Sequence, residues 1–582
     1  MNEAENAALD PIAVCKVVDT NVAQCQDCYR CVRACPVKAI RITNSQAHIE
    51  QELCIHCGTC VRQCPQHAKY IVSTLDEVRE LLGSGRPVAA SIAPSFAAAL
   101  PAEQLYRLPT ALRLLGFTYV CETAEGAKLI SDRSLDCVPD ASICTACPAV
   151  VCYVEKYHHE ALSRMIPVVS PMVAHGRMLK QRYGEDCAVV FIGPCAAKKA
   201  EAMRPENRDA VDVVITFREL FDWLEEAKID LSRLDDGSFD FTGLSGGTLE
   251  TARLFPVDGG MLKTCGAASD GTSTEVMSLS GAKQVTSFFD VDPELVHFKL
   301  VEPLFCPGGC IDGPGFSDLG NIYYRKNAVI SYAEKSAGLG GGERDGAGRV
   351  DTSAGFVAVD TRADEPVSEE AIQSVFRLTG KSDPSRQLNC GACGYSSCRE
   401  NAIAVVRNMA EPEMCIPYMR RLAQQRADRI IETTPTAIVI LDHDLNLIHM
   451  NPAFHRMFMC SNSILGRHIS YIFDAQDFET LAASDTDELD AIRTYYGTRY
   501  HETLYAMRDE RQYVGMFTDL SHMKFDEGQM NLIKKQLLDN AKELLEHQIS
   551  FSQEMAHQLG RNTAKTEELV KRMIDLYEEH DV

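Results

Sequence analysis

Cysteine spacing constrains this 582-residue chain more than any other feature of its sequence. Of its 24 cysteines, sixteen gather into groups. Two matched runs, CQDCYRCVRACP and CIHCGTCVRQCP, occur within the first 65 residues. Thiolates are soft ligands that select transition metals and iron–sulfur clusters, so the runs predict bound metal. Their cysteines are Cys25, Cys28, Cys31, Cys35, Cys54, Cys57, Cys60 and Cys64.

The cellular compartment decides between metal binding and disulfides for these thiols. No charge-free apolar run reaches the roughly 18 residues of a membrane helix, and MNEAENAALDPIA lacks the basic flank and apolar stretch of a signal peptide. We therefore expect a cytoplasmic protein, where reducing thiol pools disfavour disulfides. The formal net charge of −24 opposes binding to nucleic acid or to an anionic membrane, so neither is expected as a partner.

Length and periodicity divide the chain into several domains, because 582 residues exceed what one core can hold. Apolar runs such as PVAASIA, AVVFIGP and DVVIT alternate with helical stretches, which is typical of an α/β domain. A glycine-rich, charged stretch then predicts a flexible linker. The expected fold class is multidomain α/β and α+β. Its predicted parts are a cysteine-rich domain at 15–74, an α/β domain at 86–335, the linker at 336–365, a small cysteine domain at 366–422, a further module at 426–520 and a helical or coiled-coil tail at 524–582.

The two N-terminal runs resemble those of ferredoxins with two [4Fe-4S] clusters, in which the fourth cysteine of each run serves the other cluster. Tight turns let three thiolates hold one face of a cubane while the fourth comes from the opposite run. The resemblance implies one cluster on Cys25, Cys28, Cys31 and Cys64, and a second on Cys35, Cys54, Cys57 and Cys60. A pair of zinc sites is the alternative, which the matched Cys-Pro endings disfavour.

Four central cysteines lie on three loops that are far apart in the sequence, CTACPAVVC, FIGPCAAKKAE and EPLFCPGGCIDGPG. Ligands from three separate loops can surround a cofactor inside a domain. Ligands that are close together in the sequence would instead form a local metal site that only stabilises a surface segment. In order and spacing the loops resemble the signature loops of [FeFe] hydrogenases. The resemblance implies an H-cluster, a [4Fe-4S] cubane that shares one thiolate with a diiron subcluster carrying CO, cyanide and a dithiolate. By position, Cys147, Cys195 and Cys306 hold the cubane and Cys310 is the bridging thiolate.

The same resemblance implies roles for residues around the diiron subcluster. Lys198 matches a family lysine that donates a hydrogen bond to a cyanide ligand, and an ammonium is the natural partner of a buried anion. Pro94 and Ser95 match a Pro-Ser pair that contacts the other cyanide. SGGTLETARLF resembles a glycine-pair stretch of the family, which implies that Gly246, Gly247 and Glu250 pack close to the cofactor. An ordinary surface position is the alternative for Lys198, and a plain helix N-terminus for the glycine pair.

Departures from the family pattern predict slow turnover. Ala146 stands where catalytic members carry a cysteine that passes protons to the diiron site, and a methyl group cannot relay a proton. Met172 replaces a family glutamine, although Ser170 of the preceding Ser-Pro pair is retained. The two glutamates of the usual proton path have no clear match. A substitute route could use Cys144, Glu122 or Glu125, for each of which a structural role is the alternative.

The C-terminal half adds a third cluster site and a sensor module. CGACGYSSCRENAIAVVRNMAEPEMC resembles a small [4Fe-4S] domain, with a zinc knuckle as the alternative. Its ligands would be Cys390, Cys393, Cys398 and Cys415. Residues 426–520 resemble a PAS domain, in which two predicted strands precede a helix capped by Asn451 with Pro452 at its first position. The apolar face of the tail favours a coiled coil, and we interpret His557 there as an ordinary helix-surface residue.

This order of domains resembles the sensory class of [FeFe] hydrogenases. We hypothesise slow, reversible H2 oxidation and proton reduction, with electron transfer through [4Fe-4S] clusters and signal output through the PAS domain and tail. A homodimer formed through the PAS domain and tail, and a signalling partner such as a kinase or phosphatase, are expected. A metabolic hydrogenase coupled to ferredoxin or NAD is the second hypothesis. The third is a non-catalytic iron–sulfur assembly or scaffold protein, which the retained Lys198, Ser95 and Cys310 disfavour.

Overall fold

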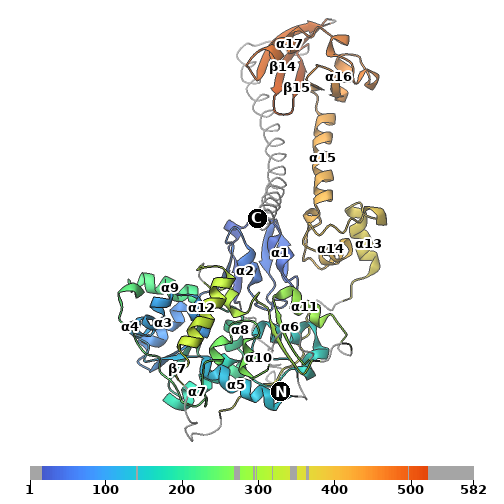
Figure 1. The fold of residues 1–582 in the computed structure, drawn as a ribbon. Helices are drawn as coiled ribbons and strands as arrows, with labels where there is room; N and C mark the ends of the chain where they lie inside the picture. Colours follow the sequence, from blue (N-terminus) through green and yellow to red (C-terminus); the bar gives the residue numbers. More distant parts are fainter. Residues whose placement is uncertain are drawn as a thin grey trace, which may run out of the picture. The chain divides into compact units, whose positions relative to one another are not determined.

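The computed structural model describes residues 16–138, 142–267, 275–292, 295, 298–316, 319–340, 350–361, 366–495 and 497–521. The chain divides into two compact units, Met1–Ile416 and Pro417–Val582. Figure 1 shows the helices and strands of both units. The predicted helical tail at 524–582, with His557, lies outside the described residues. Among the described residues, no helix is both long and apolar enough to span a bilayer.

The N-terminal domain repeats one arrangement twice around its cysteines. Strand β1 (Val18–Thr20) pairs antiparallel with β4 (Lys69–Ile71), and β2 (Ile40–Thr43) with β3 (Gln46–Ile49). Each cysteine run turns through a left-handed residue, Tyr29 or Gly58, into one short helix, α1 (Arg30–Ala34) or α2 (Thr59–Gln63). Both helices end at the last cysteine of their run, so the third and fourth thiols of each run are held at opposite ends of a helical turn.

The central domain is built on a four-stranded parallel sheet with strand order β6-β5-β7-β8. The predicted strands are confirmed as β5 (Val88–Ile92), β7 (Ala188–Gly193) and β8 (Val213–Thr216), and β6 (Tyr119–Glu122) completes the sheet. Every residue of β5, β7 and β8 is buried, which explains their unbroken apolar sequence. The chain runs from β5 to β6 at one edge and later from β7 to β8 at the other, so the strand order reverses between β5 and β7.

Helices cover both faces of this sheet (Figure 1). On one side lie α3 (Leu75–Gly83), α4 (Leu108–Leu114) and α9 (Phe217–Glu226); on the other lie α5 (Ala124–Asp136) and α7 (Pro171–Tyr183). A smaller parallel pair joins β9 (Val276–Ser280) to β10 (Leu300–Leu304). The remaining helices are α6 (Pro148–Tyr157), α8 (Ala197–Ala202), α10 (Gly260–Thr264), α11 (Ala282–Phe289) and α12 (Ile322–Lys335).

The prediction of a flexible linker over 336–365 is wrong for residues 350–361. These residues form an extended strap on the central domain, in which the Val169 amide donates to the Thr352 carbonyl at 2.9 Å. The Ala354 amide bonds the Pro167 carbonyl at 3.1 Å, and the Val359 amide bonds the Glu155 carbonyl at 2.7 Å. Ala354 and Phe356 also pack against buried clusters of the domain. The backbone hydrogen bonds have partners that are distant in the chain, so the local sequence gave no sign of them.

Beyond the strap, α13 (Glu369–Leu378) and α14 (Cys398–Val406) form the small cysteine domain, and α15 (Ile416–Thr433) follows. The second unit holds an antiparallel sheet of order β12-β11-β15-β14-β13. The predicted strand, strand and helix are confirmed as β11 (Ala437–Leu441), β12 (Leu447–Met450) and α16 (Pro452–Met457), and the Asn451 side chain accepts from the Phe454 amide as the predicted cap. The other elements are α17 (Gln476–Ala483), β13 (Glu488–Tyr495), β14 (Thr498–Met507) and β15 (Gln512–Asp519).

A buried ion pair ties the end of the parallel sheet to the helices around it. Glu122, the last residue of β6, accepts two hydrogen bonds from Arg253 at 2.8 and 3.0 Å, and both side chains are 0% exposed. Arg253 also donates to the Ser336 and Leu339 carbonyls, and the Tyr332 hydroxyl donates to Glu122. All of these hydrogen bonds hold the Glu122 carboxylate in place. Glu122 therefore has a structural role and is not free to carry protons.

Replacing Arg253 should therefore show how much the Glu122–Arg253 ion pair contributes to the free energy of unfolding. Arg253→Met leaves a buried carboxylate without its partner, and we expect the free energy of unfolding to fall by about 3–5 kcal/mol. Urea denaturation followed by fluorescence of the chain's one tryptophan, Trp223 in α9, measures the change. The matched control is Lys299→Met, which removes an exposed pair with Glu275 and should leave the midpoint unchanged. Equal midpoints for the two variants would contradict this account.

Candidate functional site

The site forms where the strand order of the central sheet reverses. Strands β5 and β7 are parallel neighbours with Ile92 opposite Ile192, so the residues that follow them leave the sheet at the same edge. Pro94 and Ser95 follow β5, and Cys195 follows β7. The carboxyl edge of a parallel sheet, at the point where strand order reverses, is the usual ligand position in such folds. The topology therefore brings two of the predicted loops to one place.

Backbone contacts bring the other two loops to the same edge. The Cys144 amide donates to the Val301 carbonyl at 2.9 Å, which ties the segment before Cys147 to β10, the strand that leads to Cys306. The Gly315 amide donates to the Pro194 carbonyl at 2.8 Å, which ties the loop after Cys310 to the one carrying Cys195.

Gly309 allows this close approach. It has a φ of +98°, and a Cβ there would lie 2.4 Å from the Pro256 carbonyl oxygen. Only glycine fits such a position, so the loop that carries Cys306 and Cys310 depends on it.

The four predicted ligands, Cys147, Cys195, Cys306 and Cys310, lie close enough for their charges to interact, and they are called the central site below. Burial is the main cause that raises the pKa of each thiol, to about 12 for Cys195. The neighbouring thiols Cys195 and Cys147 raise the pKa of Cys310 further. Thiols must lose their protons to bind iron, so this crowded pocket needs a strong positive charge among them.

Lys198 supplies one positive charge next to the central site. The side chain begins in the first turn of α8, is 8% exposed, and lowers the pKa of Cys147, Cys195 and Cys310. Its Nζ lies 2.7 Å from a Glu201 carboxylate oxygen and 3.4 Å from the Ala146 carbonyl oxygen. The alternative of an ordinary surface lysine is therefore wrong.

Two buried hydroxyl groups, in segments that follow the central sheet's strands and the Cys147 helix, have no hydrogen-bond partners within the described part of the chain. Ser95 lies in the short helix η2 (Pro94–Ala98), which contacts η9 (Cys310–Asp312), and its Oγ has no hydrogen-bond partner among the described residues. The same holds for the Oγ of Ser170, at the N-terminus of α7. A buried hydroxyl that lacks a partner costs free energy unless a ligand accepts its hydrogen bond. The donor set of thiols, ammonium and free hydroxyl fits an anionic iron–sulfur cofactor.

The candidate residues for proton transfer differ in their surroundings. Ala146 is half-buried beside Lys198, and Glu122 is held by Arg253. Glu125 is 0% exposed and accepts from the Thr242 amide and hydroxyl, both at 2.8 Å, with the His175 Nε2 at 3.7 Å from its carboxylate.

Sequence reasoning missed Glu302 in β10. It is 2% exposed, burial raises its pKa to about 8, and its charge interacts with both Cys144 and Cys310. The sequence signal for Glu302 was a carboxylate within an apolar run, four residues before the predicted ligand Cys306.

The segment around Gly246 is largely open to solvent. Gly247 and Glu250 are exposed, and the nearest atom to a Cβ placed on Gly247 is the Lys128 Cε at 3.6 Å. The packing of this segment against a cofactor stays a prediction. The residue of this stretch that is buried with a clear role is Arg253.

The N-terminal cysteines fall into the two crossed sets that the resemblance to ferredoxins implies. Cys25, Cys28, Cys31 and Cys64 line one cavity and are called the Cys25 set. In the Cys54 set, burial raises the pKa of Cys60 first, and Cys54, Cys57 and Cys35 raise it further. Among the described side chains, no three thiol, imidazole or carboxylate groups meet at the spacing of a single chelated ion.

The Cys54 set lies against the central site. A Cβ on Gly58 would lie 2.4 Å from the Pro314 Cγ, so α2 packs directly on the loop that follows Cys310. Arg62 donates to the Asp312 carbonyl at 2.8 Å and forms an ion pair with its carboxylate, and its charge lowers the pKa of Cys306. One side chain therefore connects the two cysteine sets.

A third site gathers Cys390, Cys393, Cys398 and Cys415. Burial raises the pKa of Cys393, and Cys415 and Cys390 raise it further. The Lys381 Nζ lies 3.3 Å from the Cys398 Sγ and also interacts with Cys415. A cation next to two thiols stabilises their thiolate forms, as metal binding requires.

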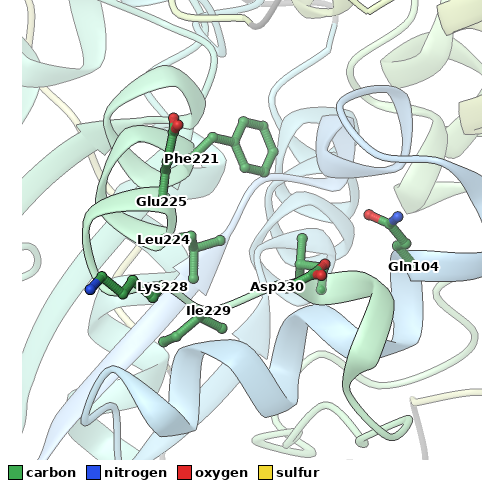
Figure 2. A pocket seen from close by; sticks show the side chains of 8 residues that line it. Gln104, Phe221, Leu224, Glu225, Lys228, Ile229 and Asp230 are labelled. Carbon is green, nitrogen blue, oxygen red and sulfur yellow. The ribbon is translucent and has the colours of Figure 1, made fainter.

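A separate surface cleft of about 420 Å³ lies beside α9 (Figure 2). Phe221 and Leu224 from the helix and Ile229 from the following turn give it apolar walls, and Glu225, Lys228 and Asp230 rim it. Its lining includes none of the predicted ligands, so we place the functional site at the cysteines.

Comparison with known families agrees with this division of the chain. Residues 86–314 match the family model for the C-terminal domain of the iron only hydrogenase large subunit. Residues 17–70 match a 4Fe-4S dicluster domain, residues 387–417 an Fe-S cluster family and residues 425–493 a PAS domain.

Individual relatives include hydrogenases and assembly factors. The periplasmic [Fe] hydrogenase large subunit of Nitratidesulfovibrio vulgaris is 27% identical over 36% of this chain and 62% of its own length. An NADP-reducing hydrogenase subunit of Solidesulfovibrio fructosivorans is 27% identical over 54% of this chain and 59% of its own. The chain thus spans less than two thirds of either protein. A cytosolic Fe-S cluster assembly factor of Danio rerio is 27% identical over 43% of this chain and 74% of its own. A solved [FeFe]-hydrogenase structure from Chlamydomonas reinhardtii, 19% identical, covers 50% of this chain and 100% of its own, with a TM-score of 0.39.

The crossed N-terminal sets generate a paired prediction. Cys64→Ser should remove the cluster of the Cys25 set and spare that of the Cys54 set, and Cys35→Ser should do the opposite, because a hydroxyl is a poor iron ligand. Iron content should fall by about four atoms per chain in each variant. Electron paramagnetic resonance of the reduced protein identifies which signal is lost. Loss of the signal belonging to each variant's own run would refute the crossed sets.

Proposed function

We propose, given that residues 86–314 form the C-terminal domain of an iron only hydrogenase large subunit, that this chain is a sensory [FeFe] hydrogenase. It oxidises H2 and reduces protons slowly and reversibly at an H-cluster. Electrons pass through its [4Fe-4S] clusters, and the PAS domain and tail report the redox state. The observation that carries the proposal is the convergence of four half-buried cysteines, an ammonium and an unpartnered hydroxyl at one edge of the parallel sheet.

In this proposal each residue of the pocket has a defined task. Cys147, Cys195, Cys306 and Cys310 would hold the H-cluster. Lys198 and Ser95 would donate hydrogen bonds to its anionic diatomic ligands, which accounts for a buried ammonium and for a hydroxyl that has no partner among the described residues. When bound, the cofactor supplies the redox chemistry of H2, while the surrounding chain orients it and excludes water.

Low turnover follows from the missing relay at Ala146. A methyl group can neither accept nor donate a proton, so the step that catalytic relatives perform with a thiol must use a less favourable route. A slow enzyme holds its reduced state long enough for a conformational equilibrium to shift, which a sensor needs. The PAS module supports the same proposal, with a homodimer formed through the PAS domain and tail, and a kinase or phosphatase as signalling partner in the cytoplasm.

Two other functions have observations in their favour. The resemblance to an NADP-reducing hydrogenase subunit favours a metabolic enzyme that exchanges electrons with ferredoxin or NAD. The resemblance to cytosolic Fe-S cluster assembly factors favours a scaffold protein without the diiron subcluster. Infrared spectroscopy separates the scaffold from both hydrogenases, and turnover separates the two hydrogenases.

Infrared spectra of protein matured in an anaerobic host should show CO and cyanide bands. Cys310→Ser should abolish these bands together with H2 chemistry, because a hydroxyl bridges soft iron centres poorly. The matched control, Cys390→Ser, removes a ligand of the third site and should leave the bands unchanged. Absence of the bands from confirmed matured wild type would establish the scaffold instead.

Ala146→Cys should raise H2 turnover, modestly, because only the first step of a relay is restored. The control Ala146→Ser adds a group of similar size that is a far weaker acid, and it should change turnover less. H2 uptake by both variants and wild type measures the effect. A wild type that already matches a metabolic hydrogenase, or equal gains from Cys and Ser, would contradict the missing-relay account.

A further inference from the structure

The small cysteine domain docks on the dicluster domain partly through hydrogen bonds to backbone carbonyl groups. The Arg33 side chain donates to the Ala392 carbonyl and to the Cys28 carbonyl, both at 3.0 Å, so it connects a loop of the third site to a loop of the Cys25 set. The Ile42 amide donates to the Met409 carbonyl at 3.0 Å. The interface therefore joins two segments separated by more than 350 positions in the sequence.

A glycine lets the two domains approach at the third site itself. Gly394 follows Cys393 and has a φ of +98°, and a Cβ there would lie 2.9 Å from the Val32 Cγ1 and 3.2 Å from the Arg33 amide nitrogen. Gly391, on the other side of Cys393, also has a positive φ of +70°, but its nearest neighbour would be 3.9 Å away. Only Gly394 is required by the contact.

The two domains share one apolar core. Val32 and Ile42 of the dicluster domain pack in a single buried cluster with Tyr395 and Met414 of the small domain. A common core makes the two domains one body, so the distance between their cluster sites is fixed by packing rather than by a linker.

Lys38 stands between the two cluster sites. Its Nζ donates to the Gly394 carbonyl at 2.8 Å and to the Val32 carbonyl at 3.1 Å. Its charge interacts with Cys35 of the Cys54 set and with Cys393 of the third site. Tyr395 also interacts with both of these thiols, and the Lys38 ammonium lies 6.0 Å from the centroid of its ring.

We infer that the third site is the electron exit of the dicluster domain, with Lys38 as the cation that both clusters share. The inference rests on the proposed function for the source of its electrons. In each step the cluster that Cys390, Cys393, Cys398 and Cys415 would hold takes one electron from a reduced cluster of the dicluster domain, and no atom moves. The two electrons of one H2 require two such steps, and between them an external one-electron acceptor of the ferredoxin class reoxidises the cluster of the third site. Cys415 directly precedes α15, so the exit adjoins the helix that leads to the second unit.

The test uses the full chain with its clusters, reduced by dithionite rather than by H2. We expect magnetic interaction between the third cluster and the dicluster clusters, seen as broadened resonance lines that sharpen in Cys390→Ser. Gly394→Ala should lose this broadening and slow reoxidation of the dicluster clusters at least tenfold. Gly391→Ala has a comparable backbone cost and should keep both properties.

Lys38→Met tests the shared cation without the backbone change. It should move the potentials of the third cluster and of the Cys54 cluster to more negative values together, because a lost cation destabilises both reduced forms. Lys16→Met, at an exposed lysine beside Asp19, should move neither. If the Gly394→Ala variant does not assemble the cluster of the third site, the potentials of the Lys38→Met variant decide whether the inference holds.

Unchanged potentials in Lys38→Met, or a wild type without magnetic interaction, would overturn the inference. Because dithionite supplies the electrons, the interaction can persist in a protein that lacks CO and cyanide bands. That result would contradict the hydrogenase proposal but not the inferred electron exit at the interface between the dicluster domain and the small cysteine domain.

Discussion

The gathering of thiols in settings shielded from water is the constraint on which the first unit depends. Burial is the main cause that raises the pKa values of Cys54 and Cys310, and neighbouring thiols raise them further. Bound iron–sulfur clusters would compensate this cost, and their binding free energy would then become folding free energy. The cysteine sets cross the sequence, since Cys64 lies with the thiols of the first run and Cys35 with those of the second. Metal occupancy in the N-terminal domain is therefore coupled to the long-range contacts that define it.

The central site is positioned by a different means. Its loops leave a fully buried parallel sheet, so the geometry is set by strand register and by close backbone approach at Gly309 and Gly315. Apolar packing holds this scaffold before any ligand binds, and the Glu122–Arg253 pair fixes its edge. The central site is thus held by apolar packing and strand register, whereas the dicluster domain gathers its cysteines from two short helices in a neighbouring part of the same unit.

Much of this organisation could be predicted from sequence, and the exceptions share a cause. Unbroken apolar runs indicate strands such as β7, a local Asn-Pro pair indicates the cap at Asn451, and the resemblance of the cysteine runs to those of ferredoxins indicates the crossed sets. The strap at 350–361 and the buried Glu302 depend instead on partners that are distant in the chain. Local pattern contains no information about such partners. The docking at Gly394 is of the same kind, because a glycine next to a cysteine usually indicates only a turn.

The long separation across the Arg33–Ala392 contact has a consequence for synthesis. The two residues are 359 positions apart, and a ribosome that adds about 5–20 residues per second needs on the order of 20 to 70 seconds to cover that span. During this interval the apolar surface around Val32 and Ile42 is on a nascent chain whose covering domain does not yet exist. The first domain must therefore remain soluble, and keep its thiols from oxidation, well before its neighbour arrives. Its dependence on the cellular machinery for iron delivery and chaperoning should be greatest in this window.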